Sequence, residues 1–468
     1  MVKKLSAILL TLFIVFSLST LALSQISRKT KDDLYSQIEL YSYTLTTIQA
    51  DYVDEIPPKD LIYGSLKGML SSLDPHSQFL NPEEYQELRT ETQGKFGGLG
   101  IEISIRDGLL TVITPIEDTP AWNAGVKAGD KIVKIDDEIT RNITLNEAVK
   151  KLRGDVGSKV TITVLRESTS KILEIEITRG IIQYQDVKNT QILESHIGYV
   201  RLSEFREDSA KAFRTALDEL AEDGADSLIL DLRNNPGGLL NVAIDITEEF
   251  LPEGKIVVST KGRRAAQNTI TKSTNTSHLI DWPMVILINE GSASGSEILA
   301  GALKDHKRAI IMGTTSFGKG SVQSVIPLPD GSGLRLTTSK YFTPSGGSIH
   351  EIGIEPDIEV KYIPKEETEK DEKDMGVKKV FENIESRDIE NSEDPEKEKQ
   401  NKKDEETRQR LLEDNQVQSA ISVLKGIRVY KKLGISDEEA ITAKEAITAK
   451  EAITAKETIA TEGPIVTE

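Results

Sequence analysis

The pattern of hydrophobic and polar residues changes twice along the chain. Residues 60–70 place apolar side chains at helical spacing, and Asn81, followed by proline and two acidic residues, is typical of a helix start. From residue 94 to about 180, apolar and polar positions alternate, as in Ile101–Ile105, which predicts a small β-rich domain. From residue 183 to about 362, short apolar runs alternate with helical segments, which predicts α/β layers.

The apolar runs of the α/β part identify its central strands. Ser227–Leu232 is expected to be a strand buried on both faces, and Pro283–Asn289 and Ala309–Met312 are further strands. The predicted fold class is α/β, with a separate β-rich domain and an N-terminal helical region at residues 30–93. That helical region either covers the α/β part or pairs with a second chain.

The N-terminal 25 residues have the pattern of an export sequence. Leu5–Leu23 carries no charge and follows two lysines, so residues 1–25 are either a cleaved signal peptide or an uncleaved membrane anchor. In both cases the remaining chain is expected outside the cytoplasm, in the periplasm or cell envelope.

The composition shifts again after residue 362. Residues 363–413 are so charged and polar that we expect them to be disordered. Residues 414–432 have a weak apolar helical stripe, and residues 433–468 contain a repeated EAITAK segment. Because a period of six residues gives no continuous apolar stripe, a solvated tail is favoured over a binding segment there.

Composition excludes several kinds of chemistry. The formal net charge is −18, which argues against a general nucleic-acid binder. The chain has no cysteine, so disulfides, thiolate metal sites and cysteine nucleophiles are excluded. Its five histidines lack metal-ligand spacing. A metal site built from cysteine or histidine is therefore not expected, and the serine chemistry considered below needs no metal and no cofactor.

The segment Asn289–Ile298, NEGSASGSEI, joins a buried strand to a helix. A serine at such a junction exposes its hydroxyl at the sheet edge, and N–H groups at the helix start can stabilise an oxyanion. On this segment alone, an ordinary N-cap is the simpler interpretation. Three serines in five positions cannot all be caps, however.

A lysine between two glycines is the candidate activator of that serine. Glycines on both sides of Lys319 allow close backbone approach, and Phe317 and Val322 supply apolar neighbours. A desolvated lysine can act as a general base, with Gln323 as its hydrogen-bond partner or as a substrate contact. A lysine in a surface turn is the competing interpretation.

Two other motifs overlap the same lysine. Residues 313–319 are almost a phosphate-binding P-loop, but Gly320 replaces the magnesium-binding hydroxyl and a strand pattern follows. Residues 316–319 also match S-x-x-K, which needs a helix that the glycines oppose. Both motifs are therefore disfavoured.

Two glycine pairs offer backbone donors. The pair Gly237–Gly238, in DLRNNPGG, can supply oxyanion N–H groups or form a tight structural turn. The loop at residues 96–100, FGGLG, opens the β-rich domain, where its N–H groups can hold a peptide carboxylate while Ile101–Ile105 pairs with the peptide.

Together and in this order along the chain, FGGLGIEI, DLRNNPGG, NEGSASGSEI and TTSFGKGSVQ resemble the carboxyl-terminal processing peptidases, the tail-specific serine proteases of the S41 type. The resemblance covers about residues 45–362 and, more loosely, the helix near 414–424. It implies a PDZ domain at 94–180 and a crotonase-like, ClpP-like protease core at 183–362.

The resemblance also implies roles for individual residues. By motif, Ser294 is the nucleophile, Lys319 the general base and Gln323 its partner, with oxyanion N–H groups from Gly238 and Gly295. The family usually has alanine at the position of Gly295. The substrate-binding residues of the PDZ domain correspond to a further set, which is Gly98, Leu99, Gly100, Ile101 and Arg153.

The predicted function is that of an exported serine endopeptidase that recognises the carboxyl ends of proteins. The alternative is an inactive, membrane-tethered peptide-binding scaffold. A histidine base is disfavoured because no histidine lies in a recognisable catalytic motif; the candidates are His76, His196, His278, His306 and His350. Expected partners are peptide C-termini, a second copy bound through the N-terminal or C-terminal helices, and a membrane if residues 5–23 stay uncleaved, but no nucleic acid.

Overall fold

The computed structural model describes residues 34–106, 108–116, 118–166, 171–276, 280–364 and 395–433. These form two compact units, one made of residues Met1–Tyr85 and Ser324–Thr337 and the other of Gln86–Gln323 and Thr338–Glu468. The expected leader at 1–25 lies outside the described residues, as do 365–394 and the repeat tail from 434 onwards. No helix within the described ranges is long and apolar enough to cross a membrane.

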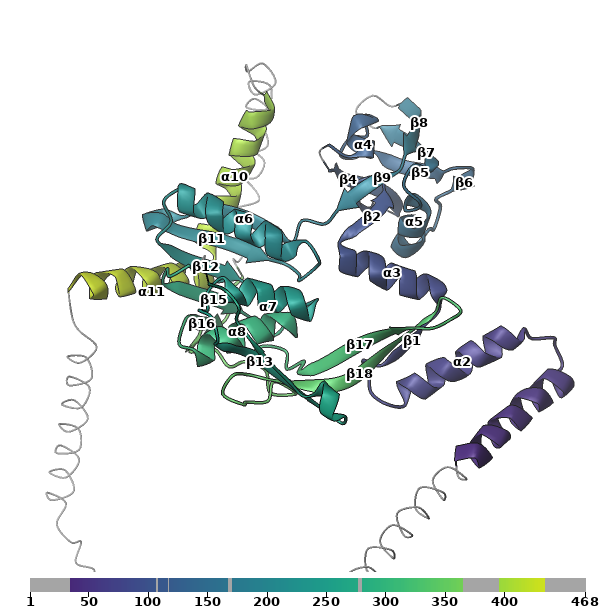
Figure 1. Cartoon of the computed structure of the whole chain (residues 1–468). Coiled ribbons are helices and arrows are strands. Elements are labelled where there is room, and N and C mark those ends of the chain that lie inside the picture. Colours follow the sequence, from purple (N-terminus) through teal and green to yellow (C-terminus); the bar gives the residue numbers. More distant parts are fainter. Residues whose placement is uncertain are drawn as a thin grey trace, which may run out of the picture. The chain divides into compact units, whose positions relative to one another are not determined.

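A six-stranded sheet is the centre of the second unit (Figure 1). Its strands lie in the order β10 (Val187–Ile192), β11 (Ile197–Leu202), β12 (Ser227–Asp231), β15 (Met284–Ile288), β16 (Ile310–Gly313) and β19 (Ile358–Glu359). All neighbours are parallel except β10 and β11. Every residue of β12 and β15 is buried, as expected for strands covered on both faces.

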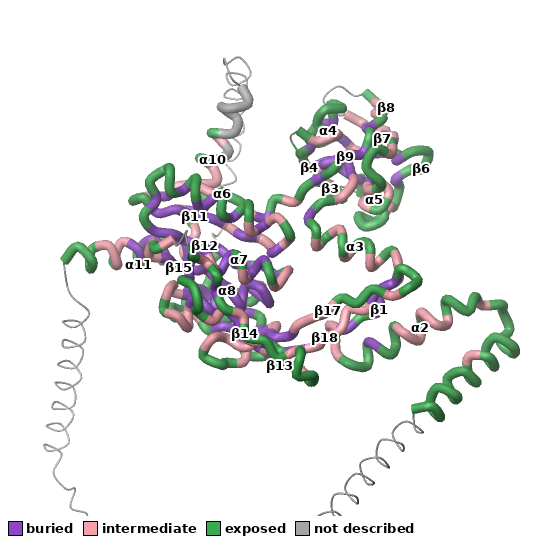
Figure 2. Tube along the Cα trace, viewed as in Figure 1, coloured by how far each residue is buried: buried purple, intermediate pink, exposed green. Residues whose placement is uncertain are grey.

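Helices cover both faces of this sheet. Leu228 and Leu230 of β12 pack in the same hydrophobic cluster as α6 (Ser209–Glu222), α7 (Leu240–Glu248) and α8 (Gly295–Asp305). Ile229, between them in sequence, packs instead in a cluster with α11 (Asn415–Lys432). Figure 2 shows the buried residues concentrated along β11, β12, β15, α7 and α8. The predicted α/β layers are confirmed.

The charged segment before α11 differs from our expectation of disorder over 363–413. Its described part forms α10 (Pro395–Glu413), which is rich in strong helix formers. Ion pairs one turn apart join Arg408 to Glu405 and Arg410 to Glu406. Leu411, which is 9% exposed, packs with α11. The expectation considered only mean polarity and missed this local helical stabilisation.

The β-rich domain occupies residues 95–183 and has its own core. One sheet has the order β3 (Ile101–Arg106), β4 (Leu109–Pro115), β5 (Lys131–Ile135), β7 (Lys159–Arg166) and β8 (Lys171–Thr178), with β6 (Glu138–Ile139) beside β5. Helices α4 (Pro120–Asn123) and α5 (Leu145–Leu152) complete it.

The start of this domain is more regular than the expected glycine loop. Residues 95–98 form strand β2 (Lys95–Gly98), which pairs with β9 (Gly180–Gln183). A Cβ atom on Gly97 would lie 2.0 Å from the carbonyl oxygen of Gly154, so glycine is required there by close backbone approach.

The first unit contains residues 34–51, which are helical, α2 (Pro58–Ser71) and β1 (Gln78–Leu80). Asn81 caps the next helix, α3 (Pro82–Gln93), through a reciprocal pair: Asn81 Oδ1 accepts from Glu84 N at 2.9 Å, and Asn81 N donates to Glu84 Oε2 at 2.8 Å. Both predicted helices are confirmed.

The remaining strands lie in both units. Strand β1 pairs with the start of β18 (Gly333–Phe342), and in the second unit β13 (Ile256–Gly262) pairs with the end of β18 and with β14 (Thr269–Lys272). Strand β17 (Ser321–Pro327) begins two residues after Lys319. Two short 3₁₀ turns span Glu194–His196 and Ala265–Gln267.

Candidate active site

Ser294 is at the junction between β15 and α8, with an unusual backbone conformation. Its φ is 53° and its ψ is −109°, and its side chain is largely buried. A non-glycine residue in such a region is strained, and strain of this kind clusters at functional sites. The neighbouring serines have structural roles instead, since Ser292 Oγ donates to Leu232 O at 2.8 Å and Ser296 Oγ to Asn235 O at 2.9 Å.

The Gly237–Gly238 pair lies directly against this junction. A Cβ atom on Gly237 would be 2.7 Å from both Gly295 N and Ser294 Cβ, and one on Gly238 would be 2.2 Å from Phe205 O. Both glycines have positive φ, at 100° and 145°. Within the described ranges, neither the Gly238 N–H nor the Gly295 N–H donates a hydrogen bond. Two backbone donors are therefore available in the two segments that meet at the Ser294 junction.

Buried Asn235 fixes the glycine loop to the Ser294 turn. Its Oδ1 accepts from Gly237 N at 2.9 Å, and its Nδ2 donates to Leu202 O at 2.8 Å. Its carbonyl oxygen accepts from Ala293 N at 3.0 Å and from the Ser296 hydroxyl. The Asn235 side chain and carbonyl oxygen therefore join the glycine loop to the Ser294 turn through hydrogen bonds.

Glu297 connects the serine to the lysine. Its carboxylate is fully buried and accepts four hydrogen bonds. Oε2 accepts from the backbone N–H groups of Ser294 at 2.8 Å and Lys319 at 3.0 Å. Oε1 accepts from Ser316 Oγ and Gly318 N, both at 2.6 Å. One carboxylate therefore binds both segments. It holds the backbone N–H groups of Ser294 and Lys319 within hydrogen-bond distance of the same oxygen atom.

Burial raises the pKa of the Glu297 carboxyl, and the four hydrogen bonds act in the opposite direction. The sequence contains a signal for this residue, because Ser294-x-x-Glu297 has the spacing of a capping box. The N-cap interpretation of this segment concerned the serines alone and did not include Glu297 as their partner.

Glu297→Gln is expected to destabilise the protein by about 2–5 kcal/mol, because two of the four donors would face an amide NH₂ group instead of an acceptor. Urea unfolding at neutral pH measures the change, with Glu253→Gln on the exposed surface as the control. Equal unfolding free energies for the two variants would show that Glu297 does not hold the two segments.

The structure brings the lysine segment close to the serine, with one difference from expectation. Lys319 and Gln323 are partly buried, and Gln323 Nε2 donates to Ser321 Oγ at 2.8 Å. Phe317, expected as an apolar neighbour of the lysine, is 62% exposed. Its N–H donates to Ser292 O, which directs the backbone toward the serine turn and the ring toward solvent.

Of the alternative histidines, His350 is near Lys319. A Cβ atom on Gly320 would lie 2.2 Å from His350 N, so only glycine permits this backbone approach. The His350 side chain is 29% exposed. His306 instead bonds the carbonyl of Ile256 at 2.7 Å, and His278 lies outside the described residues.

The expected peptide-binding residues also come together. Strand β3 is at the end of its sheet order, and a cavity beside it is lined by Gly98, Leu99, Gly100, Ile101 and Arg153 with apolar side chains such as Leu152. An edge strand beside an apolar groove suits a peptide that adds as a further strand.

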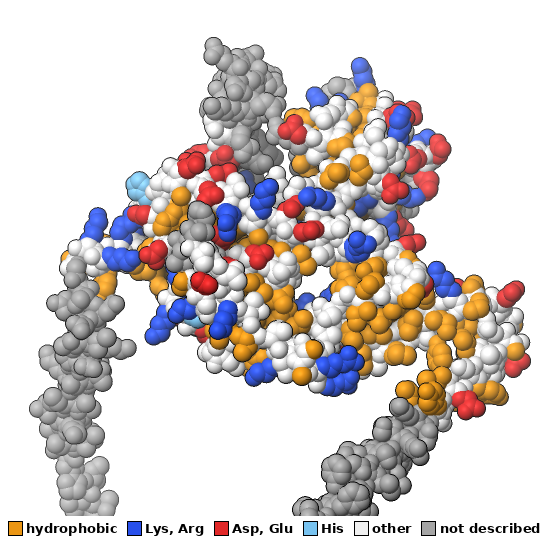
Figure 3. Space-filling model, viewed as in Figure 1, with side chains coloured by type: hydrophobic (Ala, Val, Ile, Leu, Met, Phe, Trp, Pro, Cys, Tyr) orange, Lys and Arg blue, Asp and Glu red, His pale blue; other side chains and the backbone are white. Residues whose placement is uncertain are grey.

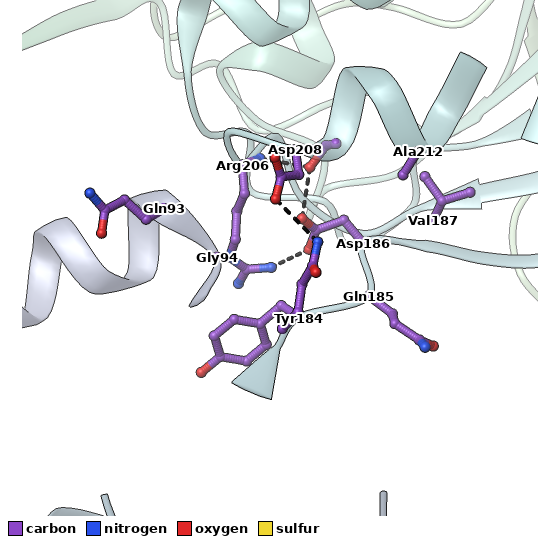
Figure 4. A pocket seen from close by; sticks show the side chains of 11 residues that line it. Gln93, Gly94, Tyr184, Gln185, Asp186, Val187, Arg206, Asp208 and Ala212 are labelled. Carbon is purple, nitrogen blue, oxygen red and sulfur yellow. Dashed lines mark hydrogen bonds and ion pairs between the residues drawn. The ribbon is translucent and has the colours of Figure 1, made fainter. Parts of the chain in front are cut away.

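Arg206 connects the β-rich domain's exit to the sheet (Figure 4). Its guanidinium binds the carboxylates of Asp186 and Glu204 and lies 4.3 Å from the ring centroid of Tyr184. The Tyr184 hydroxyl accepts from Arg153 Nη2 at 2.7 Å. Tyr184, Asp186 and Arg206 line a cavity of about 310 Å³, and none of these contacts was expected from the sequence.

The residue before Arg206 continues this connection to the candidate site. Phe205 N donates to Gly237 O at 2.9 Å, and Phe205 O accepts from Leu239 N at 2.7 Å. A series of direct contacts therefore leads from Arg153 to the glycine loop beside Ser294.

Comparison with known proteins gives two family matches. The model described as Peptidase family S41 matches residues 196–360, and that described as PDZ domain matches residues 111–166. A carboxy-terminal-processing protease of Bartonella bacilliformis is 44% identical over 367 residues, which are 77% of this chain and 83% of that protein. A carboxyl-terminal-processing protease of Synechocystis sp. is 41% identical over 302 residues, 63% of this chain and 70% of that one. The solved photosystem II D1 C-terminal processing protease matches with 32% identity and a TM-score of 0.41, covering 68% of this chain and 86% of that chain.

Proposed function

The chain belongs to the carboxyl-terminal processing proteases of peptidase family S41, serine endopeptidases that here carry a PDZ domain, and we propose that it is exported, cleaves with a Ser294–Lys319 pair and selects substrates by their C-terminal tails. The observation that carries the catalytic part is the Glu297 carboxylate, which accepts from the backbone N–H groups of both Ser294 and Lys319.

The proposed reaction begins with attack of Ser294 Oγ on the scissile carbonyl carbon. The uncharged Lys319 amine takes the hydroxyl proton, and the N–H groups of Gly238 and Gly295 stabilise the oxyanion. The tetrahedral intermediate then collapses, the C–N bond breaks, and the lysine gives its proton to the leaving amine. Water hydrolyses the acyl-enzyme by the same route, with the lysine again as base. Gln323 orients the lysine, and no cofactor takes part.

Tail selection is assigned to the groove beside β3. The substrate's terminal carboxylate binds the N–H groups of Gly98–Gly100, while its last residues pair with Ile101 and its strand. Arg153 is at the end of α5 by the same groove, with its guanidinium carbon 4.2 Å from the Phe96 ring centroid and a hydrogen bond to Tyr184. This position supports a role for Arg153 in sensing an occupied groove.

An unstructured substrate with a free C-terminus is expected to be cleaved about tenfold faster, in kcat/KM, than the same substrate with an amidated C-terminus, because a hydrogen-bonded charge is lost. Arg153→Ala is expected to reduce this ratio, whereas Lys150→Ala on the same helix leaves it unchanged. Equal cleavage of both substrates by the wild type would remove tail selection from the proposal while leaving proteolysis intact.

Self-association is assigned to the N-terminal helical residues 34–51. Large apolar side chains are exposed along this helix, and Figure 3 shows hydrophobic side chains gathered there; they include Leu34, Tyr35, Ile38, Tyr41, Tyr43 and Ile48. The apolar stripe of α11 is already covered by the sheet, which favours the N-terminal helix as the pairing surface.

Ile38→Glu is expected to reduce the molar mass measured by light scattering, because it places a charge on the exposed apolar surface of this helix. An unchanged mass would contradict the assignment.

Export is proposed from the leader pattern of residues 1–25. The anchored alternative requires residues 5–23 to remain uncleaved. Cell fractionation with N-terminal sequencing of the mature chain distinguishes a cleaved leader, a retained anchor and a protein that stays in the cytoplasm, the last of which would refute export.

A further inference from the structure

Arg233 is the residue at which the C-terminal part of the chain meets the catalytic loops. It lies two residues after the end of β12 and is 8% exposed. Its Nε and Nη2 donate to the two oxygens of Asp231 at 2.9 and 2.7 Å. Its remaining nitrogen, Nη1, donates to Asp414 Oδ2 at 2.8 Å and to Gln416 Oε1 at 2.7 Å. About 180 residues of chain separate these partners.

Asp414 uses its two oxygens for different purposes. Oδ1 caps α11, accepting from Gln416 N at 2.8 Å and from Val417 N at 3.2 Å, while Oδ2 is left to bind Arg233. Gln416 is almost fully buried, and its Nε2 donates to Val360 O at 2.7 Å. The start of α11 is thus fixed in place and presents two acceptors to one guanidinium.

The backbone around Arg233 leads directly into the oxyanion loop. Leu232 O accepts from Ser292 Oγ and from Asn235 N. Asn234 N donates to Asn289 Oδ1 at 2.8 Å. Gly237 and Gly238 follow within five residues, so Arg233 lies in the same short loop as the Gly238 N–H.

We propose that Asp414 and Gln416 are positioning residues for the oxyanion hole, acting through Arg233. This inference rests on the proposed role of the Gly238 N–H. Asp231 and Arg233 alone leave one guanidinium nitrogen without an acceptor in a buried position, where an unsatisfied charge-bearing donor is unfavourable. Asp414 and Gln416 supply the missing acceptors for the Arg233 guanidinium. They thereby hold the end of β12 and the loop that follows it in one conformation.

Asp414→Asn tests this proposal without removing the helix cap, because asparagine caps helices about as well as aspartate. The matched control is Asn415→Ala. Asn415 holds the same segment through Lys361 O at 2.8 Å and Ile363 N at 3.0 Å, but it does not bind Arg233. Steady-state cleavage of an unfolded protein gives kcat and KM for both variants. Hydrogen exchange of the 232–240 peptide segment reports loop opening independently of activity.

The expected result for Asp414→Asn is a kcat about tenfold below that of the control, an unchanged KM and faster exchange over 232–240. A kcat equal to the control's, or unchanged exchange, overturns the proposal. If the wild type itself cleaves nothing, the proposed function fails instead. The exchange measurement alone then decides whether Asp414 holds the loop.

Discussion

Ser294→Ala is expected to abolish proteolysis, with kcat reduced at least about 10⁴-fold, while the protein stays folded. In the proposed reaction, Ser294 Oγ is the only protein atom that forms a bond to the scissile carbonyl carbon. The backbone contacts that shape its turn, including its N–H bond to Glu297, do not involve the hydroxyl oxygen. Disappearance of a full-length unfolded protein with a C-terminal tag, followed on gels, measures the loss.

The two neighbouring serines provide the control for this variant. Ser292→Ala and Ser296→Ala each remove a hydroxyl that bonds a buried carbonyl, so they are expected to cost about 1 kcal/mol of stability and much less activity. Turnover by Ser294→Ala comparable to theirs would exclude Ser294 as the nucleophile. If wild type and variants bind tails equally but none cleaves, the inactive scaffold is the correct alternative.

The sequence predicts the elements of the sheet well because their signals are local. The fully apolar run of β12 and the apolar run at β15 are unambiguous strand patterns. Ser294 could be singled out from Ser292 and Ser296 only by family resemblance. In the structure the distinction has a physical basis, because the outer two hydroxyls bond core carbonyls and Ser294 alone has the strained backbone.

Contacts between distant segments could not be predicted in the same way. Nothing in the residues around Arg233 indicates that Asp414 binds it, because the pairing requires α11 to dock on the sheet. The helix α10 was missed for a related reason. Average polarity predicts disorder, whereas α10 carries two ion pairs between neighbouring turns and buries Leu411 near its end.

Lys319 is the second residue whose loss is expected to be severe. Lys319→Ala should lower kcat at least about 10³-fold without weakening binding of a tail peptide, because the base is lost while the groove beside β3 is intact. Lys319→Arg should be equally inactive. Arginine keeps the positive charge but is always protonated in proteins, so it cannot accept the serine proton. Comparing the two variants separates base catalysis from simple electrostatic stabilisation, since a charge effect alone would leave Lys319→Arg active.

His350→Ala is the matched control for the base, because the His350 backbone lies against Gly320, next to Lys319. If lysine is the base, this variant retains turnover within a few-fold of the wild type. Loss of turnover in His350→Ala together with retained turnover in Lys319→Ala would identify a histidine base. The Glu297 hydrogen bonds make the lysine the stronger candidate, because one carboxylate binds the backbone N–H groups of both Ser294 and Lys319. Within the described residues, no hydrogen bond connects His350 to Ser294 in this way.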